Sequence, residues 1–248
     1  MFPNNQILLL GSENNEKRDL NMANKLELKS IKELLDYNFF IPDYQRGYRW
    51  TDQQVKDLLE DVTSFALKGK DEYEFYCIQP LAVKEMKSEE KERNNLPMNQ
   101  TWYEVIDGQQ RLTTILLILS VLQNNLKGYG IDSFYNLKYA RQNEISSIIE
   151  DYEKNSELNF NTVDEYYITN ALEVINNWKK SQIPDSIRAL ESAITSHLPD
   201  DLDNDDADED EDEFDDNESK HKNGDSSIRI NHDKARNVRF IWYEADEN

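Results

Sequence analysis

Cysteine and long apolar runs are nearly absent from this 248-residue chain. Its one cysteine is Cys77, so no disulfide can form within the chain and a zinc site of the CxxC type is excluded. The longest uninterrupted apolar run, from Ile115 to Leu119, is far too short to span a bilayer. The tract from Ile7 to Leu10 has no basic residues before it and no small-residue cleavage pattern, so it does not predict a signal peptide. These absences favour a cytoplasmic, reducing location without membrane contact.

The motifs of several common enzyme classes are also missing. The chain has no GxxxxGK[ST] loop and no GxGxxG segment, which excludes a standard P-loop or Rossmann nucleotide site. It has three scattered histidines and no HExxH, His–Cys or Ser–His–Asp arrangement. Metalloprotease and triad-hydrolase functions are therefore disfavoured.

Basic residues are few, and 28 Lys and Arg against 50 Asp and Glu give a formal net charge of −22. Residues 200–218 alone hold 14 acidic and no basic residues, so the remainder carries −22 + 14 = −8. Such a run predicts a disordered, solvated spacer. The alternative is a mimic of polyanionic DNA that occupies a basic groove until DNA displaces it.

Apolar periodicity and turn signals predict an alternation of strands and helices. Residues 39–42 are expected to be extended because a proline follows Ile41, and 85–100 is expected to be a polar loop. Strands are predicted at 25–28, 74–83, 102–106 and 237–244, and helices after Ser30, at 51–68, from Gln109, and at 144–155, 163–180 and 184–197. The core-like strand so near the end indicates that the fold continues in a longer parent protein.

The segment Asp107-Gly108-Gln109-Gln110-Arg111 lies between a predicted strand and a predicted helix. A helix N-terminus carries unpaired N–H groups and a partial positive charge, so it favours anions. Arg111 in the first turn opposes the helix dipole unless an anion compensates it. The simpler interpretation is that Asp107 caps the helix and Gly108 makes a turn. The chemistry alone leaves both interpretations open.

A second cluster, from Tyr44 to Trp50, combines arginines with aromatic rings. Such a mixture suits stacking on a base and binding a phosphate, but it also suits an aromatic corner that packs a helix onto a sheet. We favour packing for Trp50 and ligand contact for Gln45 and Arg46. Nearby carboxylates are candidates for a divalent metal, although their spacing selects none of them and no metal site is assigned: Asp43, Glu104 and Asp107.

Together, the segments IPDYQRGYRW (41–50) and VIDGQQRLTT (105–114) resemble the N-terminal domain of GmrSD-type modification-dependent restriction enzymes. Related domains occur in phosphorothioate-sensing and other phage-defence proteins. The resemblance runs from about Leu26 to Glu244. It implies an α/β (α+β) fold with a ParB/sulfiredoxin-like small mixed sheet and surrounding helices. The implied organisation is a disordered leader (1–24), a nucleotide-binding core (25–128), a mainly helical segment (129–198), a disordered acidic insert (199–235) and a strand returning to the core (236–248).

The resemblance further implies binding and hydrolysis of a nucleoside triphosphate, GTP or UTP rather than ATP, with Mg²⁺ as a candidate cofactor. Hydrolysis would be coupled to recognition of modified phage DNA and to a nuclease module or partner protein, and the chain is a candidate homo-oligomer. The implied catalytic residues are Asp107, Gln110 and Arg111, and the implied nucleotide-binding residues are Tyr44, Gln45, Arg46, Gly108, Gln109, Thr113 and Thr114.

The chain departs from the family pattern in three places. It supplies no HNH-type nuclease module, and it lacks the helix with a Phe…Asn…Gly segment that follows the terminal strand. It also carries Gln79 where relatives often have a glycine. Two further functions therefore stay open: a non-catalytic DNA-binding or regulatory module that recognises modified DNA, and an inactive fragment that needs a partner. The overall acidity argues against strong non-specific binding to DNA phosphates.

Overall fold

The computed structural model describes residues 25–68, 75–141, 145–154, 160, 162–196 and 237–245. The predicted leader and acidic tract lie outside these residues.

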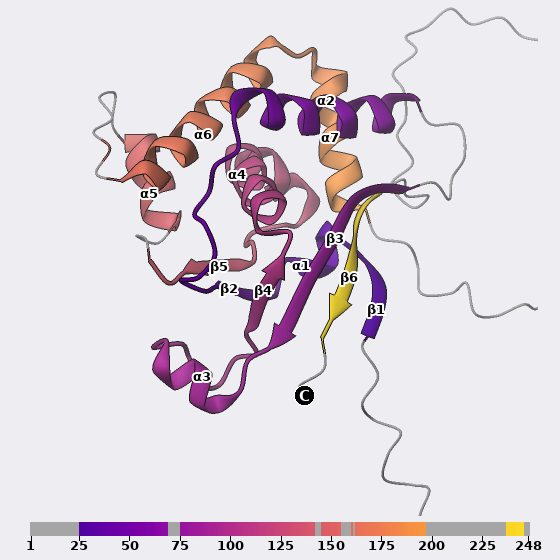
Figure 1. The fold of residues 1–248 in the computed structure, drawn as a ribbon. Coiled ribbons are helices and arrows are strands. Elements are labelled where there is room, and N and C mark those ends of the chain that lie inside the picture. The colour runs from indigo at the N-terminus through magenta and orange to yellow at the C-terminus, as the bar shows by residue number, and fades with distance from the viewer. Residues whose placement is uncertain are drawn as a thin grey trace, which may run out of the picture.

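Six strands form one mixed sheet in the order β1-β6-β3-β4-β2-β5 (Figure 1). The β1/β6 and β3/β4 pairs are antiparallel, whereas β3/β6, β2/β4 and β2/β5 are parallel. The predicted mixed sheet of an α+β protein is confirmed. The strands are β1 (Lys25–Ser30), β2 (Asn38–Ile41), β3 (Phe75–Glu85), β4 (Tyr103–Asp107), β5 (Asn136–Tyr139) and β6 (Asn237–Glu244).

The helices agree largely with the periodicity of the sequence. Ser30 caps the first one through a capping box with Glu33, as the sequence predicts. None of the described helices is long and apolar enough to cross a membrane. The helices are α1 (Ile31–Leu34), α2 (Asp52–Lys68), α3 (Ser88–Arg93), α4 (Gln109–Leu126), α5 (Ile145–Lys154), α6 (Val163–Ser181) and α7 (Pro184–Thr195), with a 3₁₀ turn, η1 (Lys127–Tyr129), after α4.

One local prediction was wrong. The expected loop at 85–100 contains α3, whose N-cap is Lys87 rather than a Ser or Thr; the Glu90 carboxylate accepts from the Lys87 backbone N–H at 2.8 Å. The segment 129–198 contains α5, α6 and α7, and it also contributes the edge strand β5, which the sequence did not predict; Leu137 and Tyr139 of this strand are buried. This segment therefore shares the sheet with the nucleotide-binding core that the resemblance implied.

Helix α4 is the central element of the core. All eight residues from Leu112 to Leu119 are buried, because this helix is apolar on every side and is enclosed rather than laid on a surface. In Figure 1, α2, α6 and α7 surround α4 and the sheet lies along its remaining side. The start of α4 follows directly from the end of β4, so the strand and the buried helix together fix the turn between them.

The C-terminal strand completes this core, as the sequence predicts. β6 lies between β1 and β3, and its Val238, Phe240 and Trp242 are fully buried. The Trp242 ring packs edge-on against Tyr37 and Tyr103, with centroid distances of 5.4 and 5.1 Å. A segment more than 40 residues from α7 in the sequence thus belongs to the same hydrophobic core.

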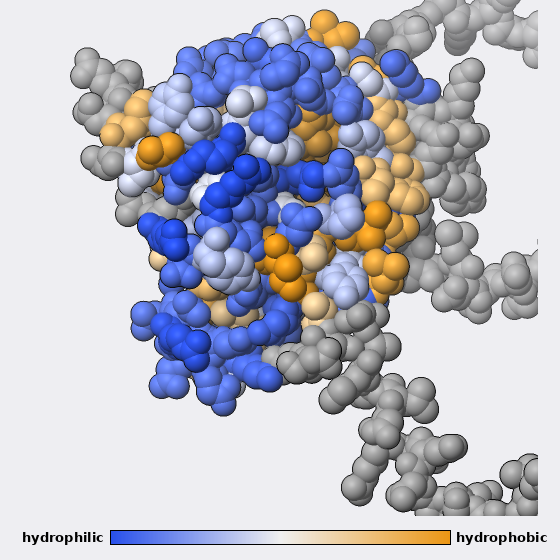
Figure 2. All heavy atoms as spheres, viewed as in Figure 1, coloured by the Kyte–Doolittle hydropathy of each residue, from blue (hydrophilic) through white to orange (hydrophobic). Residues whose placement is uncertain are grey.

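The described residues cover the second face of the sheet only in part. Four apolar side chains form a small separate core, namely Phe40, Met86, Leu96 and Trp102. Beyond it, Leu26, Leu28 and Ile106 are 68, 42 and 44% exposed. Figure 2 shows such hydrophobic residues, in orange, over the strands among mostly hydrophilic neighbours.

A bulge in β3 meets the turn that precedes α4. The register of β3 against β6 shifts between Cys77 and Pro80, and Gln79 within this bulge has a φ of +100°. Gly108 has a φ of +94°, and a Cβ placed on it would lie 2.9 Å from the carbonyl oxygen of Pro80. Glycine is therefore required at position 108 both by its backbone conformation and by the close approach of β3.

The first prediction concerns Gly108→Ala. A left-handed conformation costs an L-residue about 1–2 kcal/mol, and the contact with Pro80 adds to it, so the free energy of unfolding should fall by about 2 kcal/mol or more. Urea unfolding measures it. The matched control is Gly128→Ala, where a Cβ meets nothing within 4 Å; it should leave stability unchanged or raise it by less than about 1 kcal/mol. Equal losses in both variants would contradict the role of the bulge.

The second prediction concerns Glu191 of α7, which is 3% exposed and accepts a hydrogen bond, at 3.3 Å, from the Tyr129 hydroxyl. Burial raises the pKa of its carboxyl above the usual value. Its contribution to stability is thus fully present below the unfolded pKa of about 4.3 and is lost as the pH rises through the folded pKa. Glu191→Gln should therefore gain stability relative to the native chain between pH 4 and pH 8. The melting temperatures of both chains are measured by thermal unfolding at each pH. A difference between them that stays constant from pH 4 to pH 8 would contradict the raised pKa of Glu191.

Candidate functional site

The two motifs of the sequence meet at one corner of the molecule. The loop from Pro42 to Thr51, which joins β2 to α2, lies against the β4–α4 turn, and the β3 bulge contacts the same turn at Gly108. The structure brings eight of the ten predicted site residues to this corner: Tyr44, Gln45, Arg46, Asp107, Gly108, Gln109, Gln110 and Arg111. Thr113 and Thr114 lie one helical turn deeper.

Three glutamine side chains hold the loop against the turn, and we refer to them as the glutamine cluster: Gln45, Gln109 and Gln110. The Gln45 amide donates to the carbonyl oxygens of Val105 and Ile106 at the end of β4. In the other direction, the Gln109 amide donates to the carbonyl of Arg46 at 2.9 Å. These bonds satisfy backbone groups of the loop and of the strand end that no regular secondary structure would pair.

Gln110 makes the most complete contact of the cluster. Its Nε2 donates to the Gly47 carbonyl at 3.0 Å, while its Oε1 accepts from the Arg49 backbone N–H at 2.8 Å. Both ends of the amide are thus used by the loop, and the residue is 8% exposed. The geometry gives Gln110 a role in positioning the loop.

The two threonines are enclosed in the core. Both are 0% exposed, and each hydroxyl donates to the carbonyl four residues earlier in α4. Thr114 also bonds the Tyr48 hydroxyl at 2.8 Å, and Thr113 bonds the Tyr139 hydroxyl at 2.7 Å. Burial raises the pKa of both tyrosines above its usual range. These hydroxyl pairs connect the loop and β5 to α4.

Aromatic packing at this corner follows the sequence prediction in part. Tyr48 is fully buried, and Trp50 packs against the core as predicted. Tyr44 is 67% exposed, and its hydroxyl donates to Glu104 Oε1 at 2.8 Å. Desolvation and the neighbouring carboxylate raise the pKa of Tyr44 to about 12, so it stays a neutral donor at physiological pH.

One ion pair of the corner has no signal in the sequence. The Arg49 guanidinium pairs with Asp164 at the start of α6 and lies 5.4 Å from the centroid of the Tyr167 ring. Gly47 makes room for it, because a Cβ on Gly47 would overlap the Asp164 carboxylate. Asp164 lies 115 residues beyond Arg49, and nothing near either residue predicts the pairing.

Three charged residues remain accessible at the corner beside the exposed Tyr44 ring. Asp107 and Arg46 are exposed and Arg111 is partly exposed. Asp107 Oδ1 accepts from the N–H of Gly108 at 2.8 Å, and Arg111 donates to the side-chain oxygen of Gln79. The glutamines and threonines thus support the corner from within, and two arginines and one carboxylate face outward.

The start of α4 adds unpaired polar groups. Gly108 is the N-cap and has no side chain to accept from the first N–H groups of the helix. The Oε1 atom of Gln109 is buried without a hydrogen-bond partner among the described residues. A buried amide oxygen of this kind would gain from a donor on a bound water or ligand. The unpaired N–H groups and the helix dipole make the start of α4 suitable for an anion, whereas Gln109 Oε1 is an acceptor and would pair only with a donor.

Asp107 is the carboxylate at the corner that is best placed to bind a metal ion. No group of three or more His, Cys, Asp or Glu within the described ranges is placed to hold a metal ion. Of the three carboxylates that the sequence singles out, Glu104 is bound by Tyr44, Asp43 lies 3.9 Å from Arg141, and Asp107 is exposed beside the helix start. Mg²⁺ often binds through one protein carboxylate and the phosphates of a substrate, which Asp107 alone would allow.

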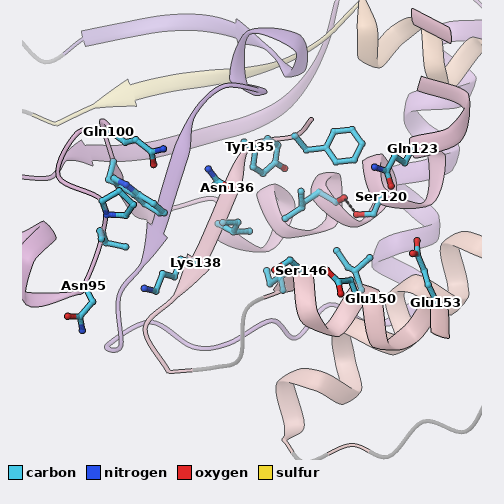
Figure 3. A pocket seen from close by; sticks show the side chains of 18 residues that line it. Asn95, Gln100, Ser120, Gln123, Tyr135, Asn136, Lys138, Ser146, Glu150 and Glu153 are labelled. Carbon is cyan, nitrogen blue, oxygen red and sulfur yellow. Dashed lines mark hydrogen bonds between the residues drawn. The ribbon is translucent and has the colours of Figure 1, made fainter. Parts of the chain in front are cut away.

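A sizeable hollow lies elsewhere, between α4, α5, β5 and the segment after α3 (Figure 3). Its volume is about 660 Å³, and no predicted site residue lines it. Figure 3 shows Asn95, Gln100 and Lys138 toward one end and Glu150 and Glu153 toward the other.

Comparison with known families agrees with the two motifs. The family described as GmrSD restriction endonuclease, N-terminal domain, matches residues 27–248. The chain belongs to this family. No curated protein sequence matches it significantly. The GmrSD domain is thus part of a restriction and defence protein, from a family that acts on DNA with a nuclease module.

The third prediction compares Gln110, which holds the loop in position, with Arg111, which is partly exposed. Gln110→Ala removes two hydrogen bonds from a buried position and leaves a carbonyl and an N–H of the loop unpaired, so the free energy of unfolding should fall by about 2 kcal/mol. Arg111→Ala removes only an exposed contact and should change stability by less than about 0.5 kcal/mol. Chemical unfolding of both variants measures the difference. A loss for Arg111→Ala as large as that for Gln110→Ala would contradict this division of roles.

Proposed function

We propose that the motif corner binds the phosphates of a nucleoside triphosphate and hydrolyses it, so that the chain acts as a sensor domain of a prokaryotic modification-dependent restriction system. The observation that carries the proposal is the glutamine cluster, which fixes the loop to the start of α4 while Arg46, Arg111 and Asp107 remain accessible. A site of this kind is organised before a ligand arrives, which is what electrostatic stabilisation of a transition state requires.

The charges support a metal-bound nucleotide rather than a free anion. Arg46 and Arg111 would bind phosphate oxygens through their planar guanidinium groups, with the first N–H groups of α4 beside them. Asp107 would repel a phosphate unless a cation lies between them. Mg²⁺ bound to the phosphates would remove this repulsion and supply charge stabilisation during phosphoryl transfer.

The remaining predicted residues would act indirectly. Gln110, predicted from the resemblance as catalytic, is placed to position the loop that carries Arg46. Gln109, Thr113 and Thr114 would hold the start of α4 in place. The preference for GTP or UTP over ATP rests on the family resemblance, and so does coupling to recognition of modified DNA by a nuclease module.

One observation favours a second function, a non-catalytic module that reads modified DNA. Tyr44 is an exposed aromatic ring two residues from the exposed Arg46, a combination suited to stacking on a base and binding its phosphate. The net charge of −22 opposes it, because DNA binding without strong basic character is weak. DNA binding that depends steeply on salt and is unaffected by nucleotide would favour this function.

The fourth prediction tests hydrolysis. Phosphate release from GTP, UTP, CTP and ATP with Mg²⁺ is measured for the native chain, Arg46→Ala, Arg111→Ala and the control Arg93→Ala, an exposed residue of α3. Loss of either corner arginine should lower kcat/KM by about tenfold or more, whereas Arg93→Ala should match the native chain. Background-level release from the native chain with every nucleotide, or equal rates for all variants, would remove the enzymatic proposal.

A further inference from the structure

Gln79 occupies a backbone conformation that is unusual for its residue type. Two described non-glycine residues have a positive φ, Gln79 at +100° and Asn95 at +53°. Asparagine adopts this region readily, whereas a glutamine there is uncommon. Its conformation is imposed by the β3 bulge, which lies between Cys77 and Pro80. A strained residue held by its surroundings is a reason to examine what its side chain does.

The Gln79 side chain reaches the phosphate-binding arginine of the proposed site. Its Oε1 accepts a hydrogen bond from Nη2 of Arg111. The bulge is also fixed relative to the start of α4, because the Pro80 carbonyl approaches Gly108 closely. Gln79 therefore holds the Arg111 guanidinium from a point that cannot shift independently of the helix start.

The chemistry of this contact leaves Arg111 able to bind an anion. A guanidinium has five N–H donors, and the neutral amide of Gln79 engages Nη2 without cancelling the positive charge. A carboxylate in the same place would neutralise it. The amide thus orients a long, partly exposed side chain while keeping its charge for a ligand.

We propose that Gln79 is a positioning residue of the nucleotide site, which orients Arg111 toward the phosphates. This inference rests on the proposed function. It requires that removal of the Gln79 side chain weakens nucleotide binding even when the substitution relieves the strain of the positive φ. A residue with a purely structural role would instead change stability and binding in the same direction.

The experiment compares Gln79→Gly with Gln79→Ala in the full chain. Both variants lack the side chain, but glycine accepts the positive φ and alanine does not. GTP and UTP with Mg²⁺ are the probes, and KM, kcat and the thermal midpoint are measured. Both variants should raise KM by about fivefold to tenfold with a smaller change in kcat, since each loses one charge-assisted contact. Gln79→Gly should unfold at a higher temperature than Gln79→Ala.

Two further variants test whether Gln79 acts through Arg111. Gln79→Glu keeps the length and the acceptor but neutralises Arg111, so it should raise KM at least as much as Gln79→Gly. In an Arg111→Ala background, Gln79→Gly should have no additional effect on KM. Native-like KM values for Gln79→Gly and Gln79→Ala, or a full additional effect without Arg111, would overturn the positioning role while leaving nucleotide binding intact. Absence of nucleotide binding by the native chain would overturn both proposals.

Discussion

The attachment of one loop to one helix start is the constraint on which the candidate site depends. The loop from Pro42 to Thr51 has no regular secondary structure of its own, and the glutamine cluster supplies the hydrogen bonds that hold it. Helix α4 is a firm support because it is buried from Leu112 to Ser120 and only Gly108 separates it from β4. The most enclosed of the described helices therefore carries the residues that must be placed most accurately.

This arrangement divides the DGQQR motif into supporting and accessible residues. Gln109 and Gln110 face inward and bind the loop, Gly108 accommodates the β3 bulge, and Asp107 and Arg111 remain in contact with solvent. A substitution of a glutamine and a substitution of an arginine would thus weaken the proposed function for different physical reasons. The first would release the loop that carries Arg46, and the second would remove a charge from an intact corner.

Local signals predicted most of the fold. Periodicity and caps gave α2, α4, α6 and α7 nearly to their ends, and the alternating apolar residues of β6 predicted a strand that returns to the core. The strand β5 was missed because its four residues are too few for a periodic signal, and α3 was missed because its N-cap position holds Lys87, which is not a capping residue type. Within the site, several side-chain contacts join residues that lie far apart in the sequence. The Arg49–Asp164 ion pair and the Gln79–Arg111 contact follow from tertiary structure and leave no local pattern.

In the proposed function, the α4 start and the loop together form a nucleotide-phosphate site. The most direct measurement is a titration of the isotope-labelled chain with Mg²⁺ and a non-hydrolysable GTP analogue, followed by backbone amide chemical shifts. Such a site predicts saturable shifts concentrated from Gly108 to Leu112 and at Arg46, with little change at the hollow lined by Asn95, Lys138 and Glu150. Shifts centred on that hollow, or no saturable shifts at millimolar nucleotide, would contradict it.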